Sequence, residues 1–246
     1  MKEISRLKSL LLASKKKPNE IEILDINDYK EGEFIGEEAT SIVRILIKSE
    51  NEKFAKKELK GFTQKVLQQF FTEGDNLFKN CHPCIIRIIY VNYGDDTHAP
   101  WILLKLEPTS LEKAILNNEL DENEKNRITA ELVLGMRYIH SRNFMYRNLK
   151  LSNILLSKNR HVRISDFGPP EEDELEASES KNIGILRFMA PELFEENDEN
   201  TKDTNKVDVY AFGIILFFIV TGSYPKFSMK NVVNGVIPII PDSIVS

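Results

Sequence analysis

The chain has 246 residues, of which 41% are hydrophobic and 29% charged, a composition ordinary for a soluble globular protein. Its 33 basic and 38 acidic residues give a formal net charge of −5, and no basic stripe suggests a nucleic-acid partner. Two cysteines are too few for a disulfide scaffold and fit a reducing compartment, so we expect a cytoplasmic or nuclear location.

The first part of the chain is predicted to be rich in strands. Residues 1–20 form a basic start with few consecutive apolar residues, which we interpret as a solvated tail or a loose helix and not a signal peptide. Alternating apolar and polar residues predict a strand, a turn and a second strand over residues 33–47, and a third strand over residues 54–57. Segments 85–93 and 101–106 predict two more strands.

One helix is predicted within this part, over residues 62–80. Apolar residues at helical spacing predict its inward face. These residues are Phe62, Val66, Phe70, Leu77 and Phe78. Directly after the helix, Cys81-His82-Pro83-Cys84 has the spacing of a redox or zinc motif. Zinc needs about four ligands, and the chain has no second Cys/His pair, so we interpret the motif as a buried turn.

The second part of the chain, after Pro108, is predicted to be mainly helical. Helices are expected over residues 111–116 and 121–140, and two short strands around residues 153–164. The inward positions of the longer helix are Ile128, Leu132, Leu134, Met136 and Ile139. The apolar run over residues 209–220 is shorter than the roughly 18–20 residues of a membrane span, so we expect a helix buried on all sides and no membrane partner. This order of elements predicts an α+β fold.

The most informative stretch is YRNLKLSNILLSKNRHVRISDFG, residues 146–168. It resembles the catalytic and metal-binding loops of eukaryotic protein kinases, HRDLKxxN followed by DFG. The resemblance covers roughly residues 25–242, with features of the tyrosine-kinase-like lineage and a catalytic loop of the serine/threonine type.

The resemblance implies a bilobal, protein-kinase-like α+β fold. A β-rich N-lobe with one helix would occupy residues 21–107, and a mainly helical C-lobe residues 108–246. The family continues for several helices beyond the position of Ser246, so the resemblance implies an incomplete C-lobe. Asp208, in the sequence VDVYAFG, matches the family aspartate that anchors the backbone of the catalytic loop.

The resemblance also implies ATP and Mg²⁺ as cofactors. Lys57 matches the lysine that grips the α and β phosphates, and Glu73 matches its partner on a helix. The alternative for this pair is a surface lysine and a solvated glutamate. Asn153 and Asp166 match the metal ligands, since a hard cation prefers oxygen donors. The nucleotide-binding positions of the family correspond to Gly36, Val43, Ala55, Lys57, Glu73, Leu104, Leu106 and Leu155.

The catalytic positions of the family correspond to Arg147, Asn148 and Lys150. Lys150 matches the lysine that neutralises the transferred phosphoryl group, and Arg147 the arginine that pairs with a phosphorylated activation segment. In this chain the segment 171–188 is strongly acidic. A fixed carboxylate is therefore one partner for Arg147, and a plain solvated loop is the alternative.

Asn148 stands where the family has its catalytic aspartate. A neutral amide cannot accept the proton of a substrate hydroxyl, and a positioned base contributes roughly 10²–10⁴ in rate. Phosphoryl transfer depends mainly on positioning and electrostatics, so some activity can survive. Of the glycine-rich loop only Gly36 remains, and Glu38 would place a carboxylate near the triphosphate, which weakens binding. Ile185 and Pro169 are further departures from the family pattern.

Three functions are compatible with these residues. The first is a pseudokinase that binds ATP–Mg²⁺ weakly and serves signalling or scaffolding through a protein partner. The second is a serine/threonine kinase that phosphorylates a protein substrate at a low rate. The third is an interaction module without a nucleotide function, or a truncated copy.

Overall fold

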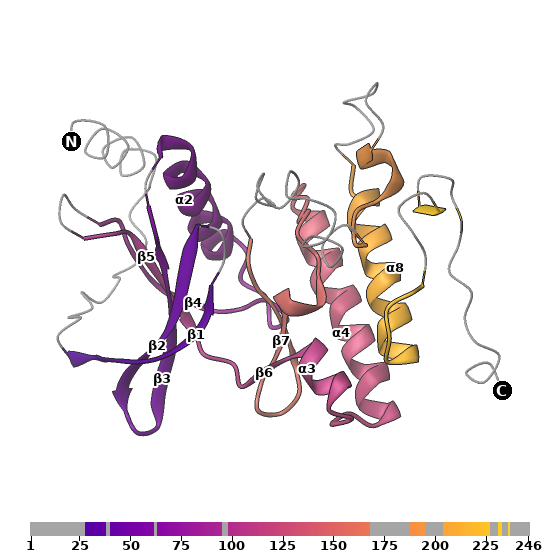
Figure 1. The fold of residues 1–246 in the computed structure, drawn as a ribbon, viewed down its shortest axis with the longest axis horizontal. Coiled ribbons are helices and arrows are strands. Elements are labelled where there is room, and N and C mark those ends of the chain that lie inside the picture. Colours follow the sequence, from indigo (N-terminus) through magenta and orange to yellow (C-terminus); the bar gives the residue numbers. More distant parts are fainter. Residues whose placement is uncertain are drawn as a thin grey trace. The chain divides into compact units, whose positions relative to one another are not determined.

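The computed structural model describes residues 28–37, 40–61, 63–94, 98–167, 187–194, 204–226, 231–232 and 236 (Figure 1). The chain divides into two compact units. The first comprises Met1–Phe78 and Arg87–Leu106, and the second comprises Lys79–Ile86 and Glu107–Ser246. The expected tail over residues 1–20, Glu38, and the segment 168–186 lie outside the described residues.

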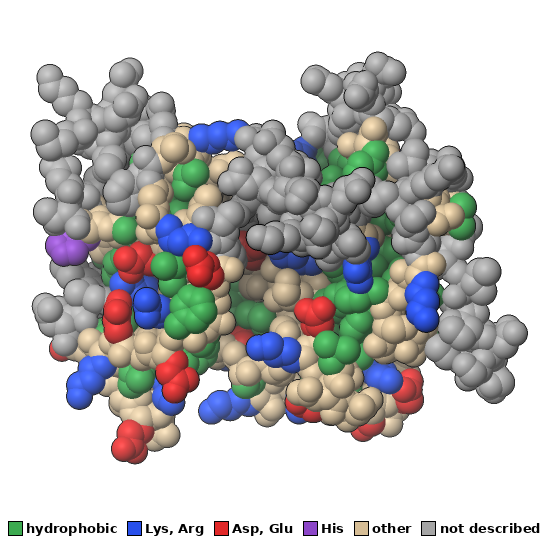
Figure 2. All heavy atoms as spheres, viewed as in Figure 1, with side chains coloured by type: hydrophobic (Ala, Val, Ile, Leu, Met, Phe, Trp, Pro, Cys, Tyr) green, Lys and Arg blue, Asp and Glu red, His purple; other side chains and the backbone are tan. Residues whose placement is uncertain are grey.

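Charged side chains of both signs are interspersed on the face of the molecule drawn in Figure 2. No continuous field of one sign covers the described residues in that view. Single apolar side chains lie between the charges, which is normal for a protein surface.

The first unit contains a five-stranded antiparallel sheet and the helix α2 (Figure 1). The strands follow the order β1-β2-β3-β5-β4 across the sheet. Their bounds are Lys30–Glu37 for β1, Ser41–Ser49 for β2, Glu52–Leu59 for β3, Ile88–Asn92 for β4 and Trp101–Lys105 for β5, and α2 covers Gln64–Lys79. The predicted strands and helix are confirmed. Strand β4 begins later than expected because Cys84 and Ile86 pair with Ile164 within the second unit.

Helix α2 covers one side of this sheet. Facing residues on paired antiparallel strands project to the same side, as Lys57 and Ile102 do. A Cβ atom on Gly74 of α2 would lie 3.5 Å from Ile102 Cδ1, so the helix packs directly against that side. Along α2 the buried apolar residues are Leu67, Phe70, Phe71 and Leu77. Phe78, in the last turn of α2, is 38% exposed, so its predicted inward position is wrong.

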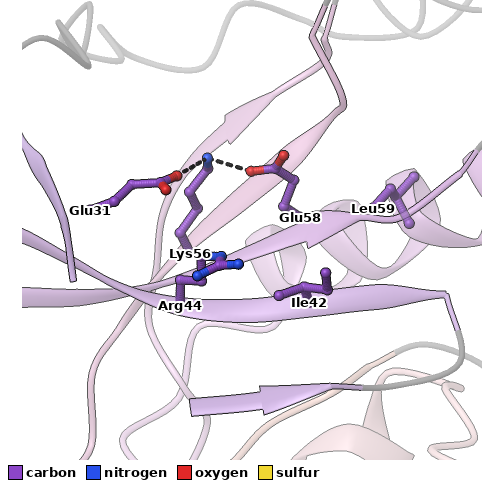
Figure 3. A pocket seen from close by; sticks show the side chains of 6 residues that line it. All are labelled: Glu31, Ile42, Arg44, Lys56, Glu58 and Leu59. Carbon is purple, nitrogen blue, oxygen red and sulfur yellow. Dashed lines mark hydrogen bonds and ion pairs between the residues drawn. The ribbon is translucent and has the colours of Figure 1, made fainter. Parts of the chain in front are cut away.

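The opposite side of the sheet carries an apolar cluster and a charged hollow. The cluster consists of Leu46, Trp101 and Leu103, with Tyr29, Phe54, Ile89 and Tyr90 packed against it. In the hollow, Lys56 lies between Glu31 and Glu58 and pairs with both, beside Arg44 and Ile42 (Figure 3). Burial by itself lowers the pKa of Lys56, but the hydrogen bonds and charges of the two glutamates raise it above its usual value. The lysine charge in this hollow is therefore compensated within the protein.

The second unit combines helices with a small antiparallel sheet (Figure 1). Its helices are α3 (Leu111–Leu116), α4 (Glu122–Ser141) and α8 (Lys206–Thr221). The sheet has the order β6-β7-β8, with bounds Thr109–Ser110, Ile154–Leu156 and Val162–Ile164. Short 3-10 helices cover Leu151–Asn153 (η2) and Pro191–Phe194 (η3). The α+β architecture predicted from the sequence is confirmed.

Helix α4 begins with a capping box and packs closely against β8. The Asp121 side chain accepts a hydrogen bond from Glu124 N, and the Glu124 side chain accepts one from Asp121 N. The predicted inward residues Ile128, Leu132, Met136 and Ile139 are buried. Leu134 is 52% exposed, so its predicted inward position is wrong. The next residue, Gly135, is buried instead, and a Cβ there would lie only 2.7 Å from Ile164 Cδ1.

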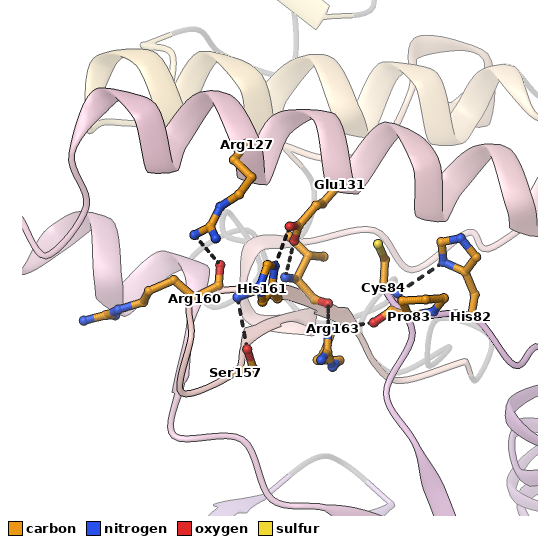
Figure 4. Close-up of polar contacts among 10 residues, drawn as sticks. His82, Pro83, Cys84, Arg127, Glu131, Ser157, Arg160, His161 and Arg163 are labelled. Atoms are coloured by element: carbon orange, nitrogen blue, oxygen red, sulfur yellow. Dashed lines mark hydrogen bonds and ion pairs between the residues drawn. The ribbon is translucent and has the colours of Figure 1, made fainter.

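Polar contacts join α4, the β7–β8 hairpin and the turn that contains Cys84 (Figure 4). Glu131 of α4 accepts a 2.8 Å hydrogen bond from a backbone N–H of β8 and lies 2.6 Å from His161 Nδ1. Arg163 donates a 2.6 Å hydrogen bond to the backbone of the turn. Cys84 is buried, which raises the pKa of its thiol, whereas Cys81 is exposed. The predicted buried turn thus holds for the second cysteine of the motif and not for the first.

Helix α8 is apolar along its length, and its buried residues lie on one side. Its buried apolar residues are Val207, Ala211, Ile214, Ile215, Phe218 and Ile219. Val209 and Val220 are 61% and 51% exposed, so the prediction of a helix buried on all sides is wrong. With Val133 of α4 and Phe212, Val209 lines a mainly apolar hollow of about 490 Å³. None of the helices in the described part of the chain combines the length and the apolar character that a membrane span requires.

Candidate functional site

Lys57 of β3 and Glu73 of α2 form a buried ion pair in the first unit. Lys57 Nζ lies 3.1 Å from Glu73 Oε1 and 3.0 Å from Oε2, so the ammonium contacts both carboxylate oxygens. The two residues are only 6% and 3% exposed. Taking two charges out of water is costly, and their pairing offsets that cost. The predicted pair is present, and the alternative of a surface lysine with a solvated glutamate is wrong.

Four further predicted nucleotide-binding residues lie on the same side of the sheet as Lys57. Val43 of β2 faces Lys57, and Gly36 of β1 faces Val43. Ala55 lies two residues before Lys57 in β3 and faces Leu104 of β5. Since the side-chain period of a strand is two residues and facing residues share a side, these positions line one surface.

In the second unit, Asp208 of α8 holds the backbone where the loop over residues 146–153 begins. Its Oδ2 accepts a 2.9 Å hydrogen bond from Tyr146 N, and its Oδ1 accepts a 2.8 Å bond from Arg147 N. Oδ2 also lies 2.8 Å from His140 Nε2. Arg147 has φ of +60°, a left-handed conformation that is uncommon for residues other than glycine. The aspartate is 2% exposed, and its predicted role as the anchor of this loop is confirmed.

Asn148, Asn153 and Asp166 form one hydrogen-bonded cluster in this unit. Asn148 Nδ2 donates to Asp166 Oδ2 at 2.7 Å. Asn153 Nδ2 lies 3.1 Å from the same oxygen and 2.9 Å from the carbonyl oxygen of Asn148, and it donates to both. A carboxylate can only accept hydrogen bonds, so the amide nitrogens, not the amide oxygens, face Asp166. The side chain at position 148 is therefore a donor to Asp166.

Backbone and aromatic contacts fix the position of Asp166. Ser165 donates to the carbonyl oxygen of Asn153 from its backbone N–H at 2.9 Å and from its hydroxyl at 3.0 Å. Tyr146 donates from its hydroxyl to the Ser165 carbonyl oxygen, and its ring meets that of Phe167 edge to face, with centroids 5.1 Å apart. Asp166 itself has φ of +61°, so these neighbours hold its backbone in a strained conformation.

A comparison with known protein families agrees with this geometry. The features concerned are the loop, its buried aspartate anchor and the Lys57–Glu73 pair. Residues 29–239 match the protein kinase domain. The chain belongs to the protein kinase family. It is 33% identical to the serine/threonine/tyrosine-protein kinase HT1 of Arabidopsis thaliana, over 68% of this chain and 43% of that protein.

Two further relatives of this kinase domain extend the comparison. The mitogen-activated protein kinase kinase kinase 3 of Arabidopsis thaliana is 27% identical over 89% of this chain and 41% of its own length. The serine/threonine-protein kinase pakH of Dictyostelium discoideum is 29% identical over 75% of this chain and 36% of its own length. The chain spans less than half the length of these curated relatives.

The kinase family implies ATP and Mg²⁺, and the described residues fit the cation through the donor atoms that they offer. Asp166 has carboxylate oxygens and Asn153 an amide oxygen, the hard donors that Mg²⁺ prefers. Their side chains are adjacent, but the 3.1 Å contact is made by the Asn153 amide nitrogen, so the Asn153 amide would have to turn to bring its oxygen to a cation bound at Asp166. Within the described part of the kinase domain, no group of three His, Cys, Asp or Glu residues could hold a metal ion. The two ligands suit a cation that also takes phosphate oxygens and water.

The remaining predicted site residues occupy less distinctive positions. Lys150 precedes η2 and is half-buried, and its carbonyl oxygen accepts a hydrogen bond from Asn153 N at 3.0 Å. Leu155 of β7 is half-buried and faces Ser110 of β6. Leu106, which follows β5 in the first unit, is also half-buried.

Two residues of this site were not predicted. His140 contacts the buried anchor Asp208, and Ser165 binds the loop backbone at Asn153 through two hydrogen bonds. Ser165 directly precedes the DFG motif, so its place in the sequence was an available signal. No pattern in the sequence relates His140 to Asp208, because the two lie 68 residues apart and meet only in the folded chain.

Proposed function

We propose that this kinase domain is a catalytically impaired member of its family that binds ATP–Mg²⁺ weakly and acts as a signalling or scaffold module. One observation carries the proposal: the side chain at the position of the catalytic base, Asn148, donates a 2.7 Å hydrogen bond to Asp166. A group that donates with its nitrogen and carries no charge does not remove a proton from a hydroxyl nucleophile. The missing base accounts for roughly 10²–10⁴ in rate.

Nucleotide binding is supported by the groups that remain. Lys57 is a cation held in place by Glu73, which suits contact with phosphate oxygens. Asn153 and Asp166 would hold Mg²⁺, which supplies a charge that bridges and neutralises phosphates when it is bound. The apolar positions that correspond to the family's adenine-binding residues are Val43, Ala55, Leu104 and Leu106 in the first unit and Leu155 in the second. Gly36 is the single glycine left in its loop, and Glu38 adds a carboxylate there, so weak binding is expected.

A second candidate function, a serine/threonine kinase of low activity, has a specific observation in its favour. The backbone of Arg147 is held by Asp208, and Lys57 is paired with Glu73, so these two positioning groups are held in place. Phosphoryl transfer relies mainly on positioning and electrostatic stabilisation. With Lys150 and Arg147 also present in the loop, slow transfer to a protein hydroxyl is the alternative to a non-catalytic role.

A thermal shift measurement tests nucleotide binding. We expect ATP with Mg²⁺ to raise the melting temperature, since a ligand that binds only the folded state stabilises it by about 2.7 kcal/mol at 100 times its Kd. ADP with Mg²⁺ and Mg²⁺ alone serve as comparison samples. A melting temperature that stays unchanged at millimolar ATP would contradict both candidate functions and leave an interaction module.

A phosphotransfer assay with labelled ATP and a generic protein substrate separates the two candidates. For an impaired domain, the wild-type signal equals that of Asp166→Ala. Wild-type transfer that Asp166→Ala abolishes would instead establish the low-activity kinase. Asn148→Asp restores a carboxylate at the base position, and Asn123→Asp on the exposed surface of α4 is the matched control for the added charge.

A further inference from the structure

Asn148 has a second consequence for this site, which rests on the proposed nucleotide binding. We propose that Asn148 is a positioning residue that orients and partly neutralises the Asp166 carboxylate, so that nucleotide triphosphate binding needs a divalent cation less than it would with an aspartate at position 148.

Asp166 Oδ2 is the meeting point of two amide donors. It accepts hydrogen bonds from Asn148 Nδ2 at 2.7 Å and from Asn153 Nδ2 at 3.1 Å. Hydrogen bonds to an ionised acceptor are short and roughly twice as strong as neutral ones. The 2.7 Å distance from Asn148 falls at the short end of the range for such bonds. Of the two donors, Asn148 therefore makes the closer contact with the carboxylate.

The Asn148 amide is not a loose surface group that happens to touch Asp166. Asn148 is 8% exposed, and Asn153 is 6% exposed. The backbone carbonyl of Asn148 binds Asn153 Nδ2 at 2.9 Å, which links the two donors to each other. Burial restricts the rotamers of both amides, and this bond further fixes the side chain of Asn153. The position of the amide relative to Asp166 is thus built into the loop.

An aspartate at position 148 would reverse the electrostatics of this contact. Two carboxylates would face each other where a donor and an acceptor now lie 2.7 Å apart. Two carboxylates at that distance either share a proton, so that only one is ionised, or need a cation between them to stay ionised. With Asn148, the cluster carries a single negative charge that already receives two hydrogen bonds. A polyanionic triphosphate meets less repulsion at such a cluster when no cation is present.

The test is a binding titration of a fluorescent ATP analogue with Mg²⁺ and with EDTA. The measured quantity is the Kd in EDTA divided by the Kd in Mg²⁺. A variant that weakens binding equally in both buffers leaves this ratio unchanged. We expect a ratio below about 10 for the wild-type chain, and a ratio at least about 10 times larger for Asn148→Asp, from the added charge. Asn148→Ala removes the donor without adding charge, so its ratio should lie between them. Asn123→Asp and Asn126→Ala, both exposed on α4, are the matched controls.

A double-mutant cycle asks whether Asn148 acts through Asp166. In an Asp166→Asn background the carboxylate is gone, so Asn148→Ala should no longer change the ratio. Circular dichroism and urea unfolding without nucleotide identify any variant that fails to fold, and Asn148→Gln, which keeps the donor, replaces a variant lost in this way. A wild-type ratio above about 100, or equal ratios for all variants that bind, overturns the inference. Absence of binding in every variant and both buffers would instead refute the proposed nucleotide binding itself.

Discussion

At position 148, asparagine and aspartate have nearly the same shape and opposite capacities for hydrogen bonding. The amide nitrogen can donate to the Asp166 carboxylate, as it does at 2.7 Å, whereas an ionised aspartate can only accept. Asn148 Nδ2 stands where an aspartate would have a carboxylate oxygen, so the chain lacks the general base at this position. The same nitrogen donates a hydrogen bond to Asp166, a predicted metal ligand. One residue, Asn148, therefore accounts both for the missing catalytic base and for an additional hydrogen bond to the Asp166 carboxylate.

Asp208 offers a prediction about stability at the residue scale. We expect Asp208→Ala to lower the free energy of unfolding by about 3 kcal/mol, because it leaves the backbone N–H groups of Tyr146 and Arg147 without an acceptor in a buried region. Asp208→Asn keeps one oxygen acceptor and should cost less. Urea unfolding measures both.

The control for Asp208 is Glu122→Ala, which removes an exposed carboxylate three residues from its partner Lys125. Its expected cost is below about 0.5 kcal/mol. If Asp208→Ala were no more destabilising than this surface change, the anchoring role would be contradicted.

The Lys57–Glu73 pair gives a second residue-scale prediction. Lys57→Met removes the cation that both oxygens of the buried Glu73 contact, and we expect a loss of about 3–5 kcal/mol in unfolding free energy. Adding Glu73→Leu should recover most of that loss, since an apolar pair can replace a buried ion pair. Chemical denaturation of the single and double variants measures the difference.

Lys60→Met is the matched lysine variant for this comparison. Lys60 pairs with Glu37 at 2.8 Å, but their side chains are 27% and 56% exposed. An exposed pair of this kind contributes at most about 1 kcal/mol. Equal losses for Lys57→Met and Lys60→Met would mean that burial of the ion pair has no energetic consequence.

At the scale of elements, Tyr224 connects three segments of the second unit. Its hydroxyl donates a 2.6 Å hydrogen bond to Glu112 of α3, and its ring lies 4.5 Å from that of Phe218 of α8, centroid to centroid. The Arg187 guanidinium lies 3.9 Å from the centroid of the Tyr224 ring, which the ring of Phe188 meets at right angles. Residues 187–188, α3 and the end of α8 are therefore held around one aromatic side chain.

Tyr224→Phe should cost about 1 kcal/mol at pH 7.5, because only the hydrogen bond to Glu112 is lost. Burial, followed by the hydrogen bond to Glu112, raises the pKa of Tyr224 above its ordinary value of 10.0. A raised pKa means that the stabilisation is complete below pH 10 and declines as the pH rises further. The gap between wild type and Tyr224→Phe in urea unfolding should therefore narrow at pH 10.5. A constant gap across this pH range would contradict the assigned contact.

At the scale of the whole molecule, each unit of the kinase domain forms its own part of the predicted chemistry. The first unit holds Lys57 against Glu73 and arranges apolar residues on the same side of its sheet. The second unit holds Asn148, Asn153 and Asp166 in one cluster. The formal charge of −5 comes from charges of both signs, which are interspersed on the face in Figure 2.

Much of this molecule could be predicted from the sequence, because local patterns determine it. Period-two and helical spacing gave the order of strands and helices, and the spacing of the residues between positions 146 and 168 identified the family. The pairing of Lys57 with Glu73 followed from the resemblance to that family. Each of these features depends on the spacing of residues close in sequence or on the family motif. They could therefore be predicted without knowledge of any tertiary contact.

The tertiary structure decided which apolar residues are buried and what Asn148 does. Phe78 has helical spacing with the buried Leu67 and Phe71 of α2 but is 38% exposed in the last turn, so the packing at the end of the helix decides its burial. Leu134 lies two residues from both Leu132 and Met136, so the helical period by itself places it on the opposite face of α4. Helix α8 is apolar all round and exposed at Val209, because a helix buries only the surface that another element covers. The sequence by itself determined that position 148 lacks a base. Only the folded chain brings Asn148 to Asp166, 18 residues later, and makes the amide a donor to that carboxylate.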